Sequence, residues 1–282
     1  MDRTDSVKRA AEAIAAADAI LIGAGAGMGV DSGLPDFRGD EGFWKAYPPL
    51  KHLGISFVEM ANPVWFMDKP EMAWAFYGHR LNLYRETVPH QGFSLLNSWA
   101  SGKQGGSFVF TSNVDGQFQR AGFAEEKIYE CHGSIHHLQC LEGCDGEVRP
   151  AEGVYIDVNL DDMTVAGEIP ACASCGSVTR PNILMFNDWS WLPQRTNAQE
   201  ERLGQWLDNI GGGGKGKLAI VECGAGTAVP TVRMSCQAFA ARYDARLIRI
   251  NPREPHGPDG TISIDTPALE GLRLIDEEIK SP

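Results

Sequence analysis

The stretch AILIGAGAGMGVDSG, residues 19–33, decides the fold predicted for this chain. Residues 19–22 are apolar and predict a short buried strand, which ends at once in a run of glycines. Glycine lets the backbone approach a ligand closely, and backbone N–H groups after a strand can bind a pyrophosphate. The stretch therefore predicts a nucleotide pocket at the carboxyl end of a buried strand.

The glycine run does not match the fingerprint of dinucleotide-binding dehydrogenases. Counted from Gly23, the last glycine of G-x-G-x-x-G is replaced by Met28, and counted from Gly25 it is replaced by Val30. An ordinary site for hydride transfer is therefore disfavoured. The run still follows a strand, so it remains a candidate for close contact with phosphates.

The same arrangement recurs along the chain. Four more apolar segments are followed at once by small and polar residues: 107–111, 127–130, 218–222 and 246–250. Helical patterns surround or separate the strands at 5–17, 68–86, 197–209 and 230–243. This alternation predicts an α/β fold with a doubly wound, Rossmann-like parallel sheet, which holds ligands at the carboxyl ends of its strands.

Residues 137–180 interrupt the alternation and carry two close pairs of cysteines. The spacings are C-x3-C and C-x2-C, formed by Cys140, Cys144, Cys172 and Cys175. Four thiolates can hold one zinc ion tetrahedrally and leave no open position for a substrate. The segment therefore predicts a small inserted module with one structural Zn2+, and unligated core cysteines are the alternative. The other cysteines are predicted to be small buried side chains.

Composition limits the classes of partner. The chain has 282 residues, of which 43% are hydrophobic, and 25 basic against 37 acidic residues give a net charge of −12. An acidic chain is a poor match for nucleic acid but is compatible with lysine-rich protein partners. The N-terminus has no signal-peptide pattern, and no apolar stretch is long enough to span a bilayer. We expect a cytoplasmic monomer or weak oligomer without nucleic-acid or membrane partners.

Taken together, the motifs resemble those of the sirtuins, the NAD-dependent protein-lysine deacylases. The family pattern G-A-G-x-S-x-x-S-G-I-P-D-F-R is similar to residues 25–38, and T-Q-N-I-D-G-L-H-x-R-A-G is similar to residues 111–122. H-G-S matches 132–134, and R-P-x-V-x-x-F-G-E is similar to 180–188. The resemblance covers almost the whole chain in the family order. The departures from the pattern are Gly29, Ser112, Gln117-Phe118, Asn187-Asp188 and, in place of a late G-T-S, Gly224-Ala225-Gly226.

The resemblance implies that NAD is the co-substrate and that acylated-lysine proteins are the partners. The products would be free lysine, nicotinamide and acylated ADP-ribose. His132 would be the catalytic base, and Asn113 and Asp115 would orient the ribose and a water. Asp36, Phe37 and Arg38 would form a cofactor-binding loop, and Phe186 would contact the substrate. The remaining cofactor-binding residues would be Gly25, Ala26, Gly27, Ser112, Gly224, Ala225, Gly226 and Asn251.

The motif Tyr77-Gly78-His79-Arg80 lies on a predicted helix, with its tyrosine and arginine on one face. An amphipathic helix with a solvated arginine is one interpretation. In the sirtuin branch that removes acidic acyl groups, however, a Tyr-x-x-Arg pair occupies this region. A guanidinium there can hold a carboxylate in bidentate fashion, with the phenol as a second donor. The resemblance therefore makes Tyr77 and Arg80 candidates for binding a succinyl or malonyl group.

The predicted division has three parts. Residues 1–136 and 181–282 form the Rossmann-like domain, 34–104 a helical cap within it, and 137–180 the zinc module.

Two other functions remain open. The altered motifs are compatible with ADP-ribosyl transfer or NAD hydrolysis. The second alternative is a non-catalytic binding module that is held together by zinc and senses NAD, although the intact His132, Asn113 and Asp115 argue against it.

Overall fold

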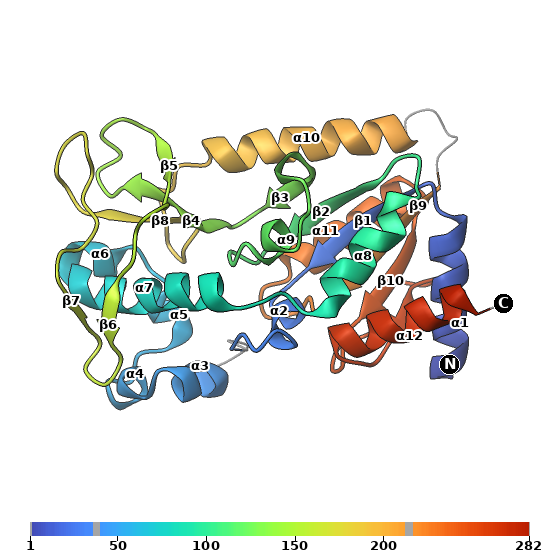
Figure 1. Cartoon of the computed structure of the whole chain (residues 1–282), viewed down its shortest axis with the longest axis horizontal. Coiled ribbons are helices and arrows are strands. Elements are labelled where there is room, and N and C mark those ends of the chain that lie inside the picture. Colours follow the sequence, from blue (N-terminus) through green and yellow to red (C-terminus); the bar gives the residue numbers. More distant parts are fainter. Residues whose placement is uncertain (1, 36–39, 212–216, 282) are drawn as a thin grey trace.

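The computed structural model describes residues 2–35, 40–211 and 217–281 of this chain. A parallel sheet occupies one end of the elongated molecule, and helices with two small antiparallel sheets occupy the other (Figure 1). The order of the parallel strands is β11-β10-β9-β1-β2-β3. Their bounds are β1 (Ala19–Ala24), β2 (Ser107–Thr111), β3 (Ile128–Glu130), β9 (Leu218–Cys223), β10 (Arg246–Ile250) and β11 (Ile262–Ile264).

Strand β1 lies at the centre of the sheet because it is apolar on both faces. All of its residues are buried, and it pairs in parallel with β2 on one side and β9 on the other. Ile20 and Ile22 belong to one hydrophobic core, whereas Ala19 and Leu21 belong to another. This alternation follows from the two-residue period of a strand, and burial on both faces is typical of a doubly wound sheet.

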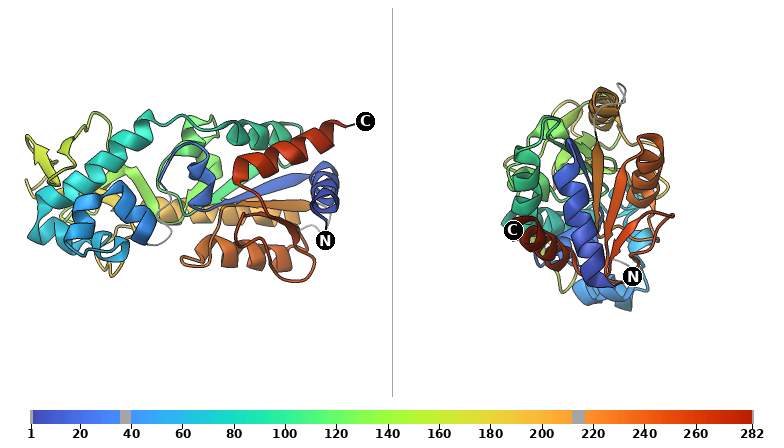
Figure 2. Two further views of the ribbon diagram at one scale, coloured as in Figure 1. Left: turned by 90° about the horizontal axis from the view of Figure 1, so that it is seen from below. Right: turned by 90° about the vertical axis from the view of Figure 1, so that its right-hand side faces the viewer.

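Helices cover both faces of the sheet (Figure 2). The core on one face includes residues of α1 (Arg3–Ala16), α8 (Gln91–Ser101) and α12 (Ala268–Lys280). The core on the other face includes residues of α10 (Gln194–Gly211) and α11 (Thr231–Arg242). The predicted α/β fold is therefore confirmed. Among the elements of the parallel sheet and its covering helices, the short strand β11 and the C-terminal helix α12 were not predicted.

The direction of the chain through the sheet changes at β1. From β1 the chain continues to β2 and β3 on one side, and it later returns to β9, β10 and β11 on the other. The carboxyl ends of β1 and β9 therefore flank the switch point, where open parallel sheets bind their ligands. The glycine run after β1, including the short helix α2 (Gly27–Val30), lies at this point.

The other end of the molecule has its own hydrophobic core. An antiparallel sheet has the order β5-β4-β8, and the pair β6 and β7 lies against α7. The strands are β4 (Gly133–Cys140), β5 (Val148–Pro150), β6 (Asp157–Asn159), β7 (Thr164–Ala166) and β8 (Thr179–Ile183). The helices are α3 (Asp40–Ala46), α4 (Pro48–His52), α5 (Phe57–Met60), α6 (Val64–Asp68) and α7 (Pro70–Glu86). Helix α8, predicted as part of the cap, packs on the parallel sheet instead.

Within the described ranges, no helix is long and apolar enough to cross a membrane. The glycine-rich segment 212–216, predicted to be a flexible linker, lies outside the described residues.

Candidate active site at the carboxyl edge of the sheet

The glycine loops after β1 and β9 are in direct contact. The Gly25 N–H donates to the Cys223 carbonyl at 3.0 Å, and the Gly27 N–H donates to the Gly224 carbonyl at 3.1 Å. A Cβ on Gly25 would lie 2.7 Å from the Ala225 Cα, and one on Gly224 would lie 2.4 Å from the carbonyl carbon of Gly27. Gly224 also has a φ of +64°. Only glycine fits this crossing, which brings two backbone loops together at the switch point.

Asn113 is held against the first of these loops. The Thr111 hydroxyl donates to the Ala24 carbonyl at 2.9 Å and accepts the Asn113 N–H at 3.0 Å. The Asn113 side chain then donates to the Gly25 carbonyl at 3.0 Å. The neighbouring Ser112 is half-buried, and its N–H donates to Ala24 at 3.2 Å. Residues 88 positions apart in the chain are thus joined in one cluster of hydrogen bonds.

Asp115 is 7% exposed, and its Oδ2 would lie 3.6 Å from a Cβ on Gly29 of the glycine run. Its Oδ1 accepts the Gln117 N–H at 2.9 Å, and its backbone carbonyl accepts a hydrogen bond from His136 Nε2 at 2.9 Å. Burial raises the pKa of Asp115 to about 6, while the Gln117 hydrogen bond and the charge of Arg80 oppose the rise. The carboxyl group therefore titrates close to neutral pH. His136 lies on β4, and its ring supports the backbone of Asp115.

Because the pKa of Asp115 is raised, we expect its ionised carboxylate to lower the free energy of unfolding. The folded state binds this proton more tightly than the unfolded state, so stability is lost as pH rises from about 4 to about 6. Above that range the cost reaches about 3 kcal/mol. We expect Asp115→Asn to raise the melting temperature clearly at pH 8 and less at pH 5. Thermal unfolding at both pH values, with exposed Asp2→Asn as a control, tests this. An equal shift at both would contradict it.

His132 follows β3 and lies at the same edge of the sheet. Its ring Nε2 is 3.4 Å from the Thr231 hydroxyl at the start of α11. Burial lowers the pKa of His132, and a hydrogen bond to the Ser112 backbone partly opposes this. The imidazole is therefore neutral at pH 7, the form in which it can accept a proton. Sequence analysis missed Thr231 because it lies 99 residues away in the chain, with no local motif.

Gly133, directly after the histidine, allows β4 to begin here. Its φ is +77°, and a Cβ at this position would lie 2.0 Å from the Asn182 carbonyl oxygen. The glycine of the His-Gly-Ser motif is therefore required by the contact between β4 and β8, and the position of His132 depends on that contact.

Asn251 is hydrogen-bonded to the second glycine loop. It is completely buried, and its amide donates to the Ala225 carbonyl at 2.9 Å. Its Oδ1 accepts the N–H groups of Arg253 at 3.0 Å and Glu254 at 2.9 Å. The structure therefore places Asn251 as a support of the residues 224–226. The predicted cofactor-binding residues Asp36, Phe37 and Arg38 lie outside the described residues.

Arg80 is buried in the cap, with only 7% of its surface exposed. Its guanidinium carbon lies 5.2 Å from the ring centre of Phe76, 5.7 Å from Tyr77 and 5.4 Å from Tyr84. The interpretation of a solvated arginine on an amphipathic helix is therefore wrong. Burial raises the pKa of Tyr77 to about 12, with the charge of Arg80 opposing, so its phenol stays protonated.

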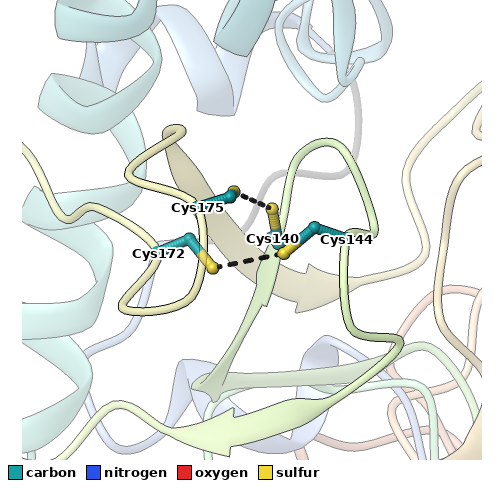
Figure 3. A group of neighbouring side chains, drawn as sticks. All are labelled: Cys140, Cys144, Cys172 and Cys175. Atoms are coloured by element: carbon teal, nitrogen blue, oxygen red, sulfur yellow. Dashed lines mark hydrogen bonds between the residues drawn. The ribbon is translucent and has the colours of Figure 1, made fainter.

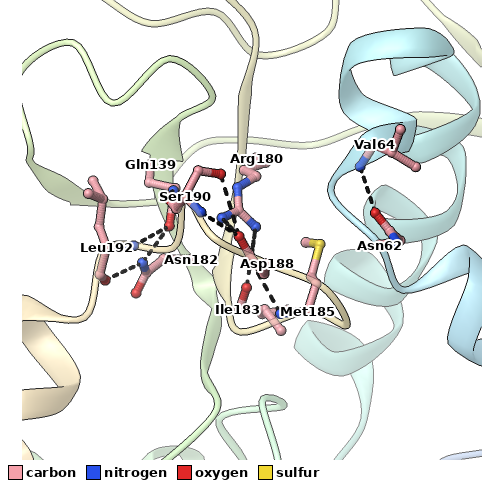
Figure 4. A network of polar contacts seen from close by, with 10 residues as sticks. All are labelled: Asn62, Val64, Gln139, Arg180, Asn182, Ile183, Met185, Asp188, Ser190 and Leu192. Carbon is pink, nitrogen blue, oxygen red and sulfur yellow. Dashed lines mark hydrogen bonds and ion pairs between the residues drawn. The ribbon is translucent and has the colours of Figure 1, made fainter.

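Phe186 and its loop are held by a buried ion pair. Asp188 accepts two hydrogen bonds from Arg180, at 2.7 and 2.9 Å, and both side chains are fully buried (Figure 4). Asn187 has a φ of +56°, a conformation that asparagine tolerates better than most residues. Asn187 thus adopts the left-handed conformation, and Asp188 forms the ion pair with Arg180. The half-buried Phe186 packs edge-on against Phe57, with ring centres 6.3 Å apart.

The four paired cysteines converge at the far end of β4 (Figure 3). Their sulfur atoms all lie within 4.8 Å of one another, and the pairs Cys140–Cys175 and Cys144–Cys172 are 3.6 Å apart. Bonds of about 2.3 Å to one tetrahedral zinc would separate the sulfurs by about 3.8 Å, so the geometry suits a metal. Backbone N–H groups of Cys175 and Ser174 lower the pKa of Cys172 and favour its thiolate. Strand β4, which follows His132 directly and ends at Cys140, lies between this cluster and the histidine.

Known proteins with similar sequences match this chain over most of their length. The chain is 29% identical to an NAD-dependent protein deacylase of Thermus thermophilus, covering 98% of this chain and 94% of that protein. It is 33% identical to NAD-dependent protein deacylase 2 of Archaeoglobus fulgidus, over 68% of each chain. The solved structure of a Sir2 homologue in complex with NAD has the same fold. Its TM-score is 0.68 at 22% identity, covering 97% of this chain and 94% of that one. The model of the Sir2 family matches residues 25–203, so this chain belongs to the Sir2 family.

Proposed function

We propose that the protein removes acyl groups from lysine side chains of other proteins in an NAD-dependent reaction. The products are free lysine, nicotinamide and O-acyl-ADP-ribose. The observation that carries the proposal is the meeting of three groups at one sheet edge. Asn113 is hydrogen-bonded to the glycine loop, the buried Asp115 carboxyl lies beside Gly29 of the same loop, and His132 is neutral beside Ser112. Family membership supports the same activity.

The residues at the switch point fit NAD. The crossing of the loops at Gly25 and Gly224 leaves no side chain between their backbones, and backbone N–H groups at such a point can bind phosphates. The cofactor-binding set would be 25–27, 224–226, Ser112, Asn113, Asp115 and Asn251, with Asp36, Phe37 and Arg38 as the loop. Bound NAD supplies a ribose carbon whose bond to nicotinamide is weak because the nicotinamide is cationic.

The protein's own contribution is positioning and proton transfer. An amide oxygen is a weak nucleophile, so alignment and charge stabilisation must supply most of the rate. Asn113 orients the groups near the ribose, and the ionised Asp115 favours the positive charge that develops there. His132 accepts the proton of a ribose hydroxyl, and its lowered pKa keeps it ready to do so at neutral pH. Thr231 fixes the orientation of its ring.

Two exposed apolar side chains belong to segments that contact His132, and they suit a protein substrate. The Leu184 N–H donates to the His132 carbonyl at 3.0 Å, and its side chain is 39% exposed. Val229, which is 46% exposed, lies two residues before Thr231. Such side chains can pack on the aliphatic stem of lysine, and Phe186 extends this surface. Within the cap, Tyr77 and Arg80 favour acyl groups that carry a carboxylate.

Product analysis tests the proposal. The protein is incubated with NAD and with acetyl-, succinyl- and long-chain-acyl-lysine peptides, and the products are separated by mass. We expect deacylated peptide and acylated ADP-ribose in equal amounts. Free ADP-ribose beside an intact peptide would indicate NAD hydrolysis, and a peptide heavier by ADP-ribose would indicate transfer. Binding of NAD without turnover would indicate a sensor.

We further propose that Cys140, Cys144, Cys172 and Cys175 hold one structural zinc ion. The spacing of their sulfurs supports this, and four thiolates leave no position for a substrate. Asp145 braces the site because it accepts hydrogen bonds from Ser174 at 2.7 Å and Arg149 at 2.6 Å, joining its two loops.

Cys172→Ala is expected to lower both zinc content and thermal stability, because binding free energy at such sites contributes to folding. Metal analysis should find close to one zinc per chain in the wild type and far less in the variant, with a melting temperature lower by several degrees. The buried Cys236→Ala serves as a control that keeps its zinc. A wild-type protein purified without chelator that contained no zinc would contradict the assignment.

The division into domains is also a proposal. Strand β4 begins at Gly133, and its antiparallel partner β8 ends at Ile183. The segment between these two ends supports an inserted module over about residues 137–180, which interrupts the domain formed by residues 1–136 and 181–282. Limited proteolysis after removal of zinc should cut first within the module. Early cleavage within the parallel sheet would contradict this division.

A further inference from the structure

Trp189 is the most exposed large apolar side chain in the described part of the chain. Its surface is 98% exposed, so both faces of the indole ring are open to solvent. Leaving such a ring in water is costly, because tryptophan is among the side chains with the most apolar surface to bury. Tryptophan is also enriched among the few residues that dominate binding energy at protein interfaces.

The backbone on both sides of Trp189 is fixed by hydrogen bonds (Figure 4). The buried Asp188 carboxylate accepts the N–H groups of Met185 at 3.3 Å and Ser190 at 3.2 Å. The Ser190 carbonyl accepts a hydrogen bond from the Gln139 amide at 2.8 Å. The indole is therefore presented to solvent on an ordered loop, and little backbone freedom is lost when a partner binds it.

The same loop begins beside His132. The Leu184 N–H donates to the His132 carbonyl at 3.0 Å, and Leu184 belongs to the surface proposed above for the lysine stem. Five residues of fully extended chain span at most about 18 Å. The hydrogen bonds of Asp188 draw the loop together, so Trp189 lies closer to Leu184 than that limit. A substrate side chain within a few positions of the acyl-lysine can therefore reach the indole.

Charge favours a cationic partner for this ring. The chain has 25 basic and 37 acidic residues, a net charge of −12, which attracts basic protein segments. An ammonium or guanidinium group is attracted to the face of an aromatic ring, and tryptophan is the best of these rings. The chain makes this contact itself at Trp65, where Lys69 Nζ lies 5.9 Å from the ring centre. At 98% exposure, neither face of Trp189 is covered by a described cation.

We propose that Trp189 is a specificity-determining residue that binds a lysine or arginine side chain of the substrate protein, within about five positions of the acyl-lysine. The cation would lie over the face of the indole. The inference rests on the proposed deacylation, because the acyl-lysine at His132 fixes which stretch of the substrate reaches the loop. Trp189 takes no part in the chemical step, so it affects the choice among substrates.

Peptides that differ at one flanking position test the proposal. All carry the acyl-lysine that the wild type turns over best, and arginine is compared with uncharged norleucine at each of the nearest positions on both sides. We expect KM to be about 2- to 5-fold lower with arginine at one or two positions, with kcat nearly unchanged. A wild type that prefers arginine at none of the positions would overturn the inference.

Trp189→Ala should remove this preference, and Trp189→Phe should keep part of it, because phenylalanine also offers a ring face. Neither variant changes the net charge, so a preference that came only from the acidity of the chain would survive in both and would overturn the inference. An equal loss on arginine and norleucine peptides in Trp189→Ala would overturn it as well. Tyr155→Ala removes another exposed aromatic ring and is the matched control, which should keep the wild-type preference.

A binding measurement does not depend on turnover. The indole Nε1–H signal of Trp189 in a nitrogen NMR spectrum is identified by its absence from Trp189→Phe. We expect it to shift when an arginine peptide is added and to change far less with the norleucine peptide. No shift with any arginine peptide would overturn the inference, while leaving deacylation intact. If no peptide is turned over, the proposed function fails, and this signal alone decides whether Trp189 binds a cation.

Discussion

His132→Ala is expected to lower kcat/KM for deacylation by about 10²–10⁴-fold, the usual contribution of a positioned general base. The imidazole lies at the sheet edge, with Nε2 3.4 Å from Thr231, and burial keeps it neutral at pH 7. Alanine removes the proton acceptor without adding bulk, so the fold and NAD binding should remain. Steady-state kinetics on an acyl-lysine peptide, with NAD binding measured by calorimetry, test this.

The exposed His52→Ala, on α4, provides the control and should retain full activity. The wild type should also lose activity as pH falls, because protonation of His132 removes the base. Its lowered pKa places that loss below pH 6.5, and the Asp115 carboxyl, with a pKa of about 6, protonates in the same region. Near-wild-type turnover by His132→Ala would remove His132 from the mechanism.

Arg80→Met is expected to reduce activity on succinyl-lysine by about 10- to 150-fold, and activity on acetyl-lysine far less. Hydrogen bonds to charged groups contribute roughly 1.5–3 kcal/mol, and this range corresponds to that loss at a site shielded from water. The aromatic rings around Arg80 provide such shielding. Methionine fills much of the same volume but cannot pair with a carboxylate. Competition between the two peptides in one reaction measures the ratio.

Arg80→Lys is the informative companion to this variant. Lysine keeps the charge but cannot form a bidentate pair, so it should restore only part of the succinyl activity. An equal loss on both peptides would mean that Arg80 serves folding or NAD binding. No loss on either peptide would mean that the buried arginine has no role in acyl choice.

Local patterns were enough to predict the sheet and the main strand ends. Residues 107–111 and 246–250 form strands with the predicted bounds, and β1 is the expected buried strand before the glycine run. Parallel strands bring their carboxyl ends to one edge, and this is why Asn113 reaches the loop at Gly25. The three residues of β11 were missed because so short a segment carries little periodic signal.

The sequence by itself determined the α/β class, the glycine loop at the switch point and the grouping of the cysteines. Each follows from residue type and short-range spacing, which act through backbone geometry and metal chemistry. Only the tertiary structure decided that Arg80 is buried, that Tyr84 is hydrogen-bonded to it, that Thr231 meets His132 and that Asn251 is hydrogen-bonded to the second glycine loop. Burial and orientation depend on side chains from distant segments that pack together, and no local pattern records which segments those will be.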